Sequence, residues 1–157
     1  MTERSVEHAT FVVERSYDAS PGRVFAAWAD PDAKSRWFGS AGEGSGEFEL
    51  DFRIGGREFS RGTVPDGQGT YTYEARYQDI VPDERIVYAY DMHLDGTRIS
   101  ISLATVELKP DGNGTRLIYT EQGAFLDGLD TPGPRQQGTG GLLDALGEEL
   151  RREPAER

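Results

Sequence analysis

The sequence predicts an α+β fold in which a seven-stranded, curved antiparallel sheet wraps around a long C-terminal helix. Three observations support this prediction: strand-like segments separated by short turns fill the middle of the chain, two short helical segments precede most of them, and leucines at helical spacing come near the end. The expected order of elements is β-α-α-β6-α, and 157 residues suit one domain with one hydrophobic core.

The first strand and the first helix follow each other directly. The segment "TFVVERSY", residues 10–17, is rich in β-branched and aromatic residues, as strands are. Ser20 and Pro21 then supply a residue that caps helices and one that suits the first helical position. Val24 and Trp28 lie four residues apart and therefore share one helical face, which predicts a short amphipathic helix.

The stretch "DPDAKSRWFG" repeats this arrangement and predicts a second short helix. Asp30 is expected to cap it, Pro31 to begin it and Gly39 to end it. Trp37 and Phe38 are neighbours, and neighbouring residues on a helix point about 100° apart, so one face cannot bury both rings. We expect Trp37 to close one end of a cavity and Phe38 to pack under the following loop. That glycine-rich loop, residues 39–47, is a candidate lid.

After the loop, six strands are expected, joined by turns that contain Pro, Asp, Asn and Gly. Connections this short allow only antiparallel neighbours, which predicts a meander joined by the N-terminal strand. The turns lie at 54–56, 65–69, 81–85, 94–96 and 109–114. The strands span about 47–53, 57–64, 70–80, 85–93, 98–108 and 115–124. In the fifth of these six, the apolar residues change phase between Leu103 and Val106, and a β-bulge would reconcile them.

The last helix is expected from about 134 to 152, with a weak first half. Pro134 can begin it, and Leu142, Leu146 and Leu150 follow helical spacing. Four glycines lie in the same segment, and each costs about 1 kcal/mol relative to alanine inside a helix. The domain is expected to span 9–152, with disordered tails at 1–8 and 153–157.

Composition excludes several classes of function. A net charge of −11 disfavours nucleic acids and anionic membrane surfaces as partners. No apolar run approaches the ~18 residues of a membrane span, and "MTERSVEHAT" lacks the order of a signal peptide, so a cytoplasmic location is expected. The chain has no cysteine and only two histidines, far apart, so we expect no metal site and no cofactor.

Several segments, taken together, resemble one known family. They are "ASPGRVFAAWADPDAKSRWFG", "FRIGGREF", "YQDIVPDERIVYAY", "GTRLIYTEQGAF" and "LLDALGEEL". In this order and spacing they resemble the activator of heat-shock protein 90 ATPase homologue-like family, in the START-like (SRPBCC) or helix-grip superfamily. The resemblance covers residues 10 to 150 and implies a hydrophobic cavity between sheet and last helix. Relatives commonly have a Gly-Trp pair early in that helix, where this chain has Thr139, which implies a more open cavity or a frayed helix start.

Tyrosines on the expected inner face of the sheet predict a ligand site. Residues of like parity on a strand share one face. A buried phenol needs a hydrogen-bond partner and can offer one to a ligand, although the same tyrosines could simply fill the core. The residues that we expect to line the site are Trp37, Tyr71, Tyr73, Tyr88, Tyr90 and Tyr119, with Glu121 as a further ligand-binding candidate.

The polar candidates for chemistry inside the cavity are Glu121, Arg98 and Asp79. Glu121 shares parity with Tyr119, and a buried carboxylate without a partner can act as an acid or base. A charge at the mouth of the cavity, paired with an arginine, explains Glu121 equally well. His93 precedes a turn and is expected to be solvated, and the alternating acidic residues around it are better explained by a hairpin than by a metal. No catalytic residue or metal ligand is therefore assigned.

Three functions remain open from the sequence. The first is binding of a small hydrophobic or aromatic molecule in the cavity, without catalysis. The second is an enzyme, such as a cyclase or hydrolase on an aromatic or polyketide-like substrate, for which Glu121 would be the acid or base. The third, from the resemblance, is a chaperone partner that activates a heat-shock ATPase in the stress response. The sequence is also compatible with a homodimer.

Overall fold

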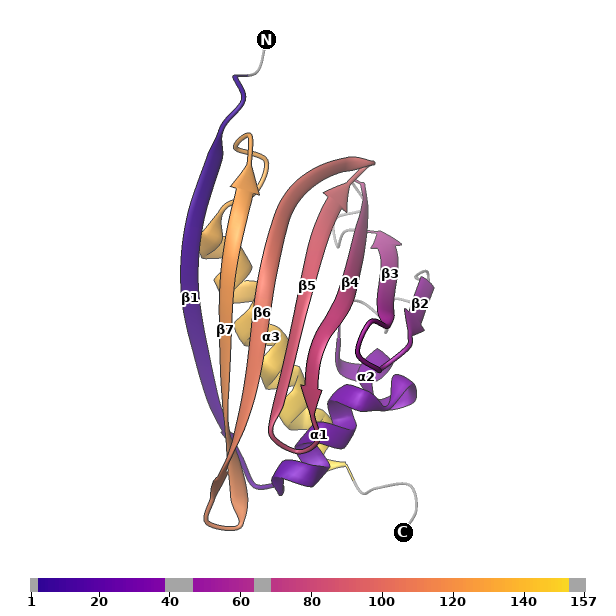
Figure 1. Cartoon of the computed structure of the whole chain (residues 1–157), viewed down its shortest axis with the longest axis vertical. Coiled ribbons are helices and arrows are strands. Elements are labelled where there is room, and N and C mark those ends of the chain that lie inside the picture. Colours follow the sequence, from indigo (N-terminus) through magenta and orange to yellow (C-terminus); the bar gives the residue numbers. More distant parts are fainter. Residues whose placement is uncertain (1–2, 39–46, 64–68, 153–157) are drawn as a thin grey trace.

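The computed structural model describes residues 3–38, 47–63 and 69–152, which form one curved antiparallel sheet and three helices (Figure 1). The predicted fold class and element order are confirmed. The strands are β1 (Val6–Tyr17), β2 (Glu47–Leu50), β3 (Arg57–Thr63), β4 (Thr70–Val81), β5 (Arg85–Leu94), β6 (Thr97–Asp111) and β7 (Gly114–Leu126). The helices are α1 (Pro21–Ala29), α2 (Pro31–Trp37) and α3 (Pro132–Arg151).

The strands lie in the order β1-β7-β6-β5-β4-β3-β2. From β2 to β7 each strand pairs with the next one in the chain, as short turns require, and β1 completes the sheet beside β7. In Figure 1, α3 crosses one face of the sheet diagonally, while α1 and α2 lie together at one end. Side chains from the sheet and from all three helices pack together on this face of the sheet.

The first strand begins at Val6, earlier than the predicted start at residue 10. Residues 6–8, which we expected to be disordered, continue the antiparallel pairing with β7, as far as Val6 opposite Leu126. Their side chains are exposed, so the polar pattern of this segment gave no sign of a strand. Backbone pairing with the long β7 supplies the order that side-chain burial does not.

The two short helices follow the predicted boundaries, but only one of the predicted caps forms. The Ser20 hydroxyl accepts a hydrogen bond from the backbone N–H of Arg23 at 3.2 Å. The Asp30 side chain makes no such bond, so its predicted capping role is wrong, and the residue instead links the two helices through extended backbone. The predicted stop at Gly39, the candidate lid at 39–46 and most of the turn at 65–69 lie outside the described residues.

A bulge in β6 lies at Ile99 and accounts for part of its irregular apolar pattern. The pairing between β5 and β6 shifts by one residue there, but it is regular from Leu103 to Val106, so no bulge forms at the predicted phase change. Ile99 thereby faces the interior together with Val106 and Leu108. Ile101 and Leu103 face outward instead, with 43% and 38% of their surfaces exposed.

Helix α3 begins two residues before the predicted start and is continuous through its glycine-rich first half. Two of its glycines face β1 at close range. A Cβ on Gly147 would lie 3.3 Å from Cε1 of Tyr17, and one on Gly140 would lie 3.1 Å from a guanidinium nitrogen of Arg15. The glycines therefore let the helix approach the sheet, which offsets their poor helix propensity. Neither α3 nor any other helix within the described ranges is long and apolar enough to cross a membrane.

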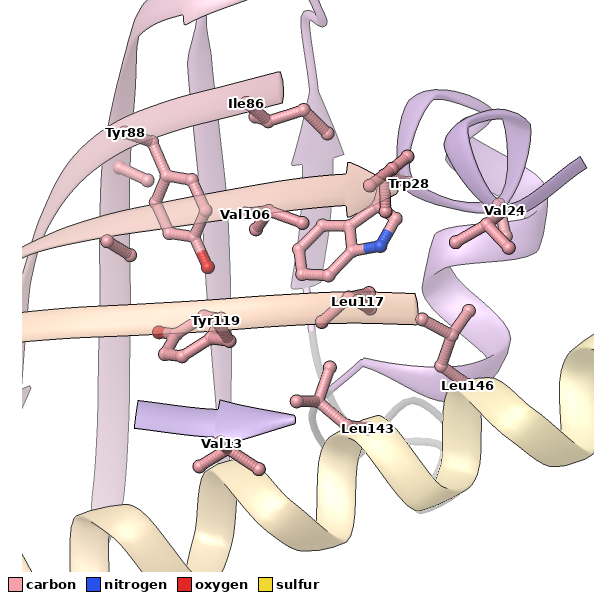
Figure 2. Close-up of a cluster of buried hydrophobic side chains, with 14 of the residues drawn as sticks. Val13, Val24, Trp28, Ile86, Tyr88, Val106, Leu117, Tyr119, Leu143 and Leu146 are labelled. Atoms are coloured by element: carbon pink, nitrogen blue, oxygen red, sulfur yellow. The ribbon is translucent and has the colours of Figure 1, made fainter. Parts of the chain in front are cut away.

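The hydrophobic core lies where α1 and the second half of α3 meet the sheet. Figure 2 shows Leu143 and Leu146 of α3 pointing toward Leu117 of β7 and toward Trp28 of α1. All four side chains are at most 1% exposed. This fully packed end supports the more open end of the sheet, where the first half of α3 lies.

Candidate functional site

A pocket of about 560 Å³ lies between the concave face of the sheet and the first half of α3. Its volume is in the range of small-molecule sites. Strands β3 to β7 form one wall, α3 forms the opposite wall, and α1 with the end of α2 closes the inner end. The described residues that line it are Trp28, Trp37, Phe38, Ser60, Thr63, Tyr71, Tyr73, Tyr88, Tyr90, Met92, His93, Leu94, Ile99, Tyr119, Pro134, Arg135, Gly138, Thr139, Leu142 and Leu143.

Six of the seven predicted site residues border this pocket, and their role in binding remains a prediction. The six are Trp37, Tyr71, Tyr73, Tyr88, Tyr90 and Tyr119. Three of them pack ring on ring, with centroids 4.9 Å apart for Tyr73 and Tyr90 and 6.0 Å apart for Tyr88 and Tyr90. The seventh, Glu121, is fully buried and hydrogen-bonds to the hydroxyls of two of these tyrosines.

Trp37 and Phe38 both line the pocket, and the loop under which Phe38 was expected to pack lies outside the described residues. Helix α2 ends at Trp37, and Phe38 adopts extended backbone with φ −104° and ψ 123°. The 100° separation of neighbouring helical residues therefore no longer applies. Phe38 packs on Tyr73 with a centroid distance of 5.2 Å, while the Trp37 indole N–H donates to the carbonyl of Ala27 at 2.9 Å.

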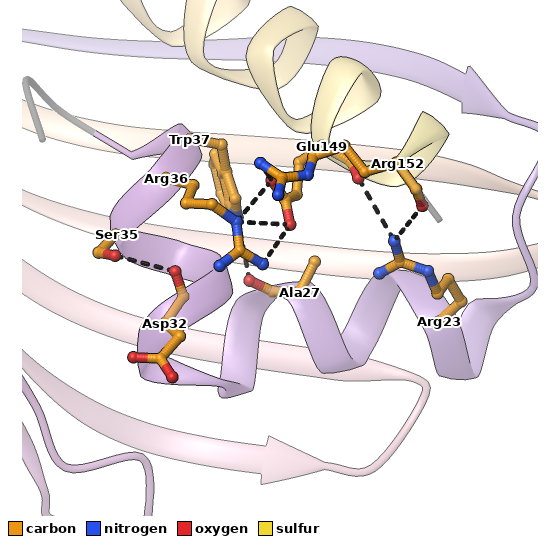
Figure 3. A network of polar contacts seen from close by, with 8 residues as sticks. All are labelled: Arg23, Ala27, Asp32, Ser35, Arg36, Trp37, Glu149 and Arg152. Carbon is orange, nitrogen blue, oxygen red and sulfur yellow. Dashed lines mark hydrogen bonds and ion pairs between the residues drawn. The ribbon is translucent and has the colours of Figure 1, made fainter. Parts of the chain in front are cut away.

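An ion pair joins α2 to α3, and side-chain-to-backbone hydrogen bonds join α1 to α3, at the end of the pocket where Trp37 lies. The Arg36 guanidinium donates to both carboxylate oxygens of Glu149, with its shortest contact at 2.7 Å (Figure 3). Arg23 donates to the backbone carbonyls of Glu149 and Arg152 at the end of α3. Because Arg36 precedes Trp37, this connection holds the indole in place at the pocket wall.

The polar centre of the site is Arg135, which extends from the first turns of α3 over the inner face of the sheet. Its Nη1 donates to the Tyr90 hydroxyl at 3.0 Å and lies 3.4 Å from Oε2 of Glu121. Its Nη2 donates to the Ser100 hydroxyl at 2.9 Å and to the carboxylate of Asp130. Only 12% of the Arg135 side chain is exposed, so these contacts replace its water.

Glu121 has both carboxylate oxygens occupied. The Tyr90 hydroxyl donates to Oε2 and the Tyr119 hydroxyl donates to Oε1, each at 2.7 Å. Together with Arg135, these contacts make Glu121 the anchor that orients two pocket tyrosines. The sequence left two explanations of Glu121 open: an unpartnered acid or base in the cavity, or a charge at its mouth paired with an arginine. The structure shows an arginine partner, Arg135, but the pair lies inside the protein and not at the mouth.

Burial keeps the pocket tyrosines in the neutral, proton-donating form. Desolvation raises the pKa of Tyr73, Tyr88 and Tyr119 well above the usual value for a phenol. Desolvation also raises the pKa of Tyr90, and the neighbouring charge of Glu121 adds to the effect. At neutral pH the wall of the pocket therefore offers hydroxyl groups rather than phenolates.

The rings of Trp37, Phe38 and Tyr88 form an aromatic wall of the pocket, and behind it lies a second buried ionic group, which the sequence analysis did not identify. Lys34 of α2 donates to Glu58 of β3 at 2.8 Å, and the Tyr77 hydroxyl donates to the same carboxylate oxygen at 2.5 Å. Burial lowers the pKa of Lys34, and the charge of Glu58 opposes that effect. The Lys34 ammonium also lies 4.3 Å from the ring centroid of Phe38, so it supports the pocket wall from behind.

Three pocket residues carry buried polar atoms that have no hydrogen-bond partner among the described residues. They are the hydroxyl of Tyr73, Nδ1 of His93 and the indole nitrogen of Trp28. His93 was expected to be solvated, but it is half-buried and borders the pocket, because the bulge in β6 changes the geometry beside it. Such orphaned groups commonly mark places where a ligand or water is bound.

The other two polar candidates do not reach the pocket. Asp79 forms an ion pair with Arg85 at 2.7 Å, and Arg98 forms one with Asp91 at 3.1 Å. Side chains of both pairs are substantially exposed, so these predictions are wrong. Within the described ranges, no three metal-binding side chains come together.

Thr139 is the residue at which the resemblance to the family implied a missing tryptophan ring. Its side chain lines the pocket and the residue is 6% exposed. The helix is continuous around it, so the fraying that the missing ring implied is not observed.

The residues that the sequence analysis missed could have been noticed only in part. Lys34 lies three residues before Trp37, so the two share a helical face, and it is one of only two lysines in the chain. Arg135 follows Pro134 but precedes the leucine pattern of α3, so nothing in its neighbourhood indicated which way it points. Its partners come from β5, β6 and β7, far away in the sequence.

Comparison with known proteins gives a family match over residues 18–151, to the family described as Activator of Hsp90 ATPase homolog 1-like protein. Among solved structures, a Rhizobium leguminosarum protein is 48% identical over 97% of this chain and 100% of its own, with a TM-score of 0.91. The Mll3558 protein from Rhizobium loti is 52% identical over 92% of this chain and 99% of its own, with a TM-score of 0.86. An AHSA1-like protein from Aeromonas hydrophila shares the fold at 19% identity over 95% of this chain and 100% of its own, with a TM-score of 0.67. Comparison with curated proteins finds no match.

Proposed function

The chain belongs to the Activator of Hsp90 ATPase homolog 1-like family and has its helix-grip fold, and we propose that it binds a small hydrophobic or aromatic molecule between the sheet and α3. The observation that carries the proposal is the pocket of about 560 Å³, whose walls are mainly aromatic and apolar side chains. A concave, mainly apolar space of this size is typical of small-molecule sites, and a ligand of complementary shape would fill it.

Binding without catalysis accounts for the site better than acid–base chemistry on Glu121. Both of its oxygens accept hydrogen bonds from protein groups, and the residue does not line the pocket. A general acid or base must reach the proton that it transfers. The hydroxyls of Tyr90 and Tyr119 stand between Glu121 and any molecule in the pocket, which favours a binding role.

Binding of Nile red, a neutral dye whose emission changes in apolar surroundings, tests the proposal. We expect saturable binding at one dye per chain, and native mass spectrometry with a library of hydrophobic metabolites should yield one-to-one complexes. Trp37→Ala, which enlarges the pocket, should change the dye affinity at least about threefold. Trp37→Phe provides a milder change if the first variant is too unstable.

Phe25→Ala is the matched control, because Phe25 packs on Phe52 and does not line the pocket. It should lower stability without changing dye affinity. If Trp37→Ala lowers stability alone and leaves dye affinity unchanged, Trp37 is an ordinary core residue. Absence of saturable binding by dye and library together would refute the proposed function.

The family match favours a second candidate, activation of a heat-shock ATPase through protein contact. This role would use the surface of the domain and not its pocket. The ATPase rate of the chaperone from the same organism, measured with and without this protein, decides it, and an unchanged rate excludes it. A cytoplasmic location belongs to both candidates and is checked by cell fractionation, while light scattering determines whether the protein is a homodimer.

A further inference from the structure

The charges around the pocket discriminate among ligands. Arg135 is the only lysine or arginine among the described residues that line it. Lys34 lies behind the aromatic wall and is 0% exposed, as is its partner Glu58. The capacity of the site to receive a negatively charged ligand therefore depends on Arg135.

The terminal nitrogens of Arg135 are already committed to protein acceptors. Nη1 is directed to Tyr90 and Glu121, and Nη2 is directed to Ser100 and Asp130. Each terminal nitrogen carries two N–H bonds, so these four contacts use all of them. A ligand carboxylate could bind Arg135 in two-pronged fashion only by displacing an internal partner.

The local charge is also unfavourable for an anion. One guanidinium faces two carboxylates, those of Glu121 and Asp130, whose side chains are 0% and 16% exposed. This end of the pocket thus carries a net negative charge that water screens poorly. A carboxylate moved from water into the pocket would lose its hydration without gaining a cation.

A neutral ligand group that accepts a hydrogen bond, unlike a carboxylate, finds an unused donor in the pocket. The Tyr73 hydroxyl is buried and has no partner among the described residues, and Tyr73 is 5% exposed and lines the pocket. A carbonyl, ester or hydroxyl oxygen on a ligand can accept its proton and remove the cost of an unsatisfied buried donor. Nδ1 of His93 and the indole nitrogen of Trp28 are further unpartnered polar atoms on residues of the pocket lining.

We infer that the pocket selects a neutral molecule with an apolar body and an acceptor oxygen, and rejects the carboxylate of the same body. This inference rests on the proposed function and names its ligand class. The orphaned Tyr73 hydroxyl favours the acceptor oxygen, and the carboxylates of Glu121 and Asp130 around the committed Arg135 disfavour the anion. Free fatty acids and aromatic acids are therefore poor ligands, while their esters and alcohols are good ones.

Competition against Nile red at pH 8 tests the inference with compounds that share one body: methyl phenylbutanoate, phenylbutanol, phenylbutanoate and butylbenzene. We expect the ester and the alcohol to displace the dye at least about tenfold more effectively than the carboxylate. Equal displacement by ester and carboxylate would overturn the inference and leave the proposed function standing. If neither the dye nor any of these compounds binds, both fail together.

Two variants with matched controls assign the selectivity to the named residues. Asp130→Asn removes one negative charge beside Arg135 and should raise the affinity for phenylbutanoate at least about threefold, with little effect on butylbenzene. Asp144→Asn is the control, because Asp144 also pairs with an arginine but is 68% exposed, and its partner Arg15 does not line the pocket as Arg135 does. An equal effect of both variants, or of neither, would contradict the role given to Asp130.

Tyr73→Phe removes only the orphaned hydroxyl. It should weaken binding of the methyl ester about threefold to tenfold and leave binding of butylbenzene unchanged. Equal losses for the ester and the hydrocarbon would mean that Tyr73 contributes shape alone, and the acceptor requirement would be withdrawn. Thermal unfolding of each variant confirms that the fold is retained.

Discussion

Replacing Glu58 with glutamine should destabilise the fold strongly, because it removes the charge that offsets a fully buried lysine. Nζ of Lys34 lies 2.8 Å from Oε1 of Glu58, and both side chains are 0% exposed. Glu58→Gln keeps the size of the side chain and leaves the Lys34 ammonium without its counter-charge. The aromatic wall of the pocket in front of Lys34 would lose its support as well.

The magnitude follows from the geometry. At a separation of 2.8 Å and an effective dielectric constant of about 20, opposite unit charges attract by about 6 kcal/mol. Desolvation of the two ions offsets much of this attraction, so the intact pair contributes little net stability. Breaking it from one side leaves the cost of a buried ion, about 3–5 kcal/mol. Because burial already lowers the pKa of Lys34, deprotonation relieves part of this cost, and we expect a loss of about 3 kcal/mol.

Urea unfolding followed by tryptophan fluorescence measures this loss, since both tryptophans of the chain lie in the folded interior. Lys34→Met combined with Glu58→Gln should recover most of the stability, because no charge is then buried. The deficit of the single variant should also shrink as pH rises toward 10.5, since the folded state releases the Lys34 proton before the unfolded state does. A single-variant loss below about 1 kcal/mol, with no recovery in the double variant, would refute the reasoning.

Three further predictions concern stability. Burial raises the pKa of Tyr88 and Tyr119 above the ordinary 10.0, so their contribution to the free energy of unfolding is complete below pH 10 and is lost as pH rises further. In an alkaline titration, phenolate absorbance should therefore increase cooperatively with unfolding. Gradual ionisation of these tyrosines in the folded protein would contradict this prediction. Gly141→Ala should stabilise α3 by about 1 kcal/mol in thermal unfolding, because a Cβ there meets nothing within 4 Å. Gly147→Ala should add less stability, because its Cβ would crowd Tyr17 of β1. Equal stabilisation by the two variants would argue against that contact. Ser20→Ala should cost about 1 kcal/mol through the lost cap of α1, and an unchanged urea midpoint would show that the cap contributes nothing.

The sheet could be predicted almost completely because its signals are local. Alternating side chains mark a strand, and Pro, Asp, Asn and Gly mark the turns between strands, so neighbouring segments already contain the information. The ends of the elements were less predictable. The strand over residues 6–8 depends on pairing with distant β7, and the direction of Phe38 depends on the helix ending one residue earlier.

The residues of the candidate site also divide into those that the local sequence predicts and those that depend on distant contacts. The tyrosines could be identified from parity along single strands, because the face of a strand is a local property. Arg135 could not, since its position results from the contact of three strands with the first turns of α3. Asp79 and Arg98 were assigned inward, but nearby opposite charges hold both at the surface. His93 was placed wrongly because the shift at Ile99 alters the geometry of its strand pair.

The most direct measurement of the central claim is energy transfer from tryptophan to Nile red. Trp28 and Trp37 are the only tryptophans of the chain, and both line the pocket. A dye bound there should show sensitised emission that saturates at one dye per chain and disappears when methyl phenylbutanoate is added. Dye emission that rises without saturation, or that methyl phenylbutanoate leaves unchanged, would contradict a ligand site between the sheet and α3.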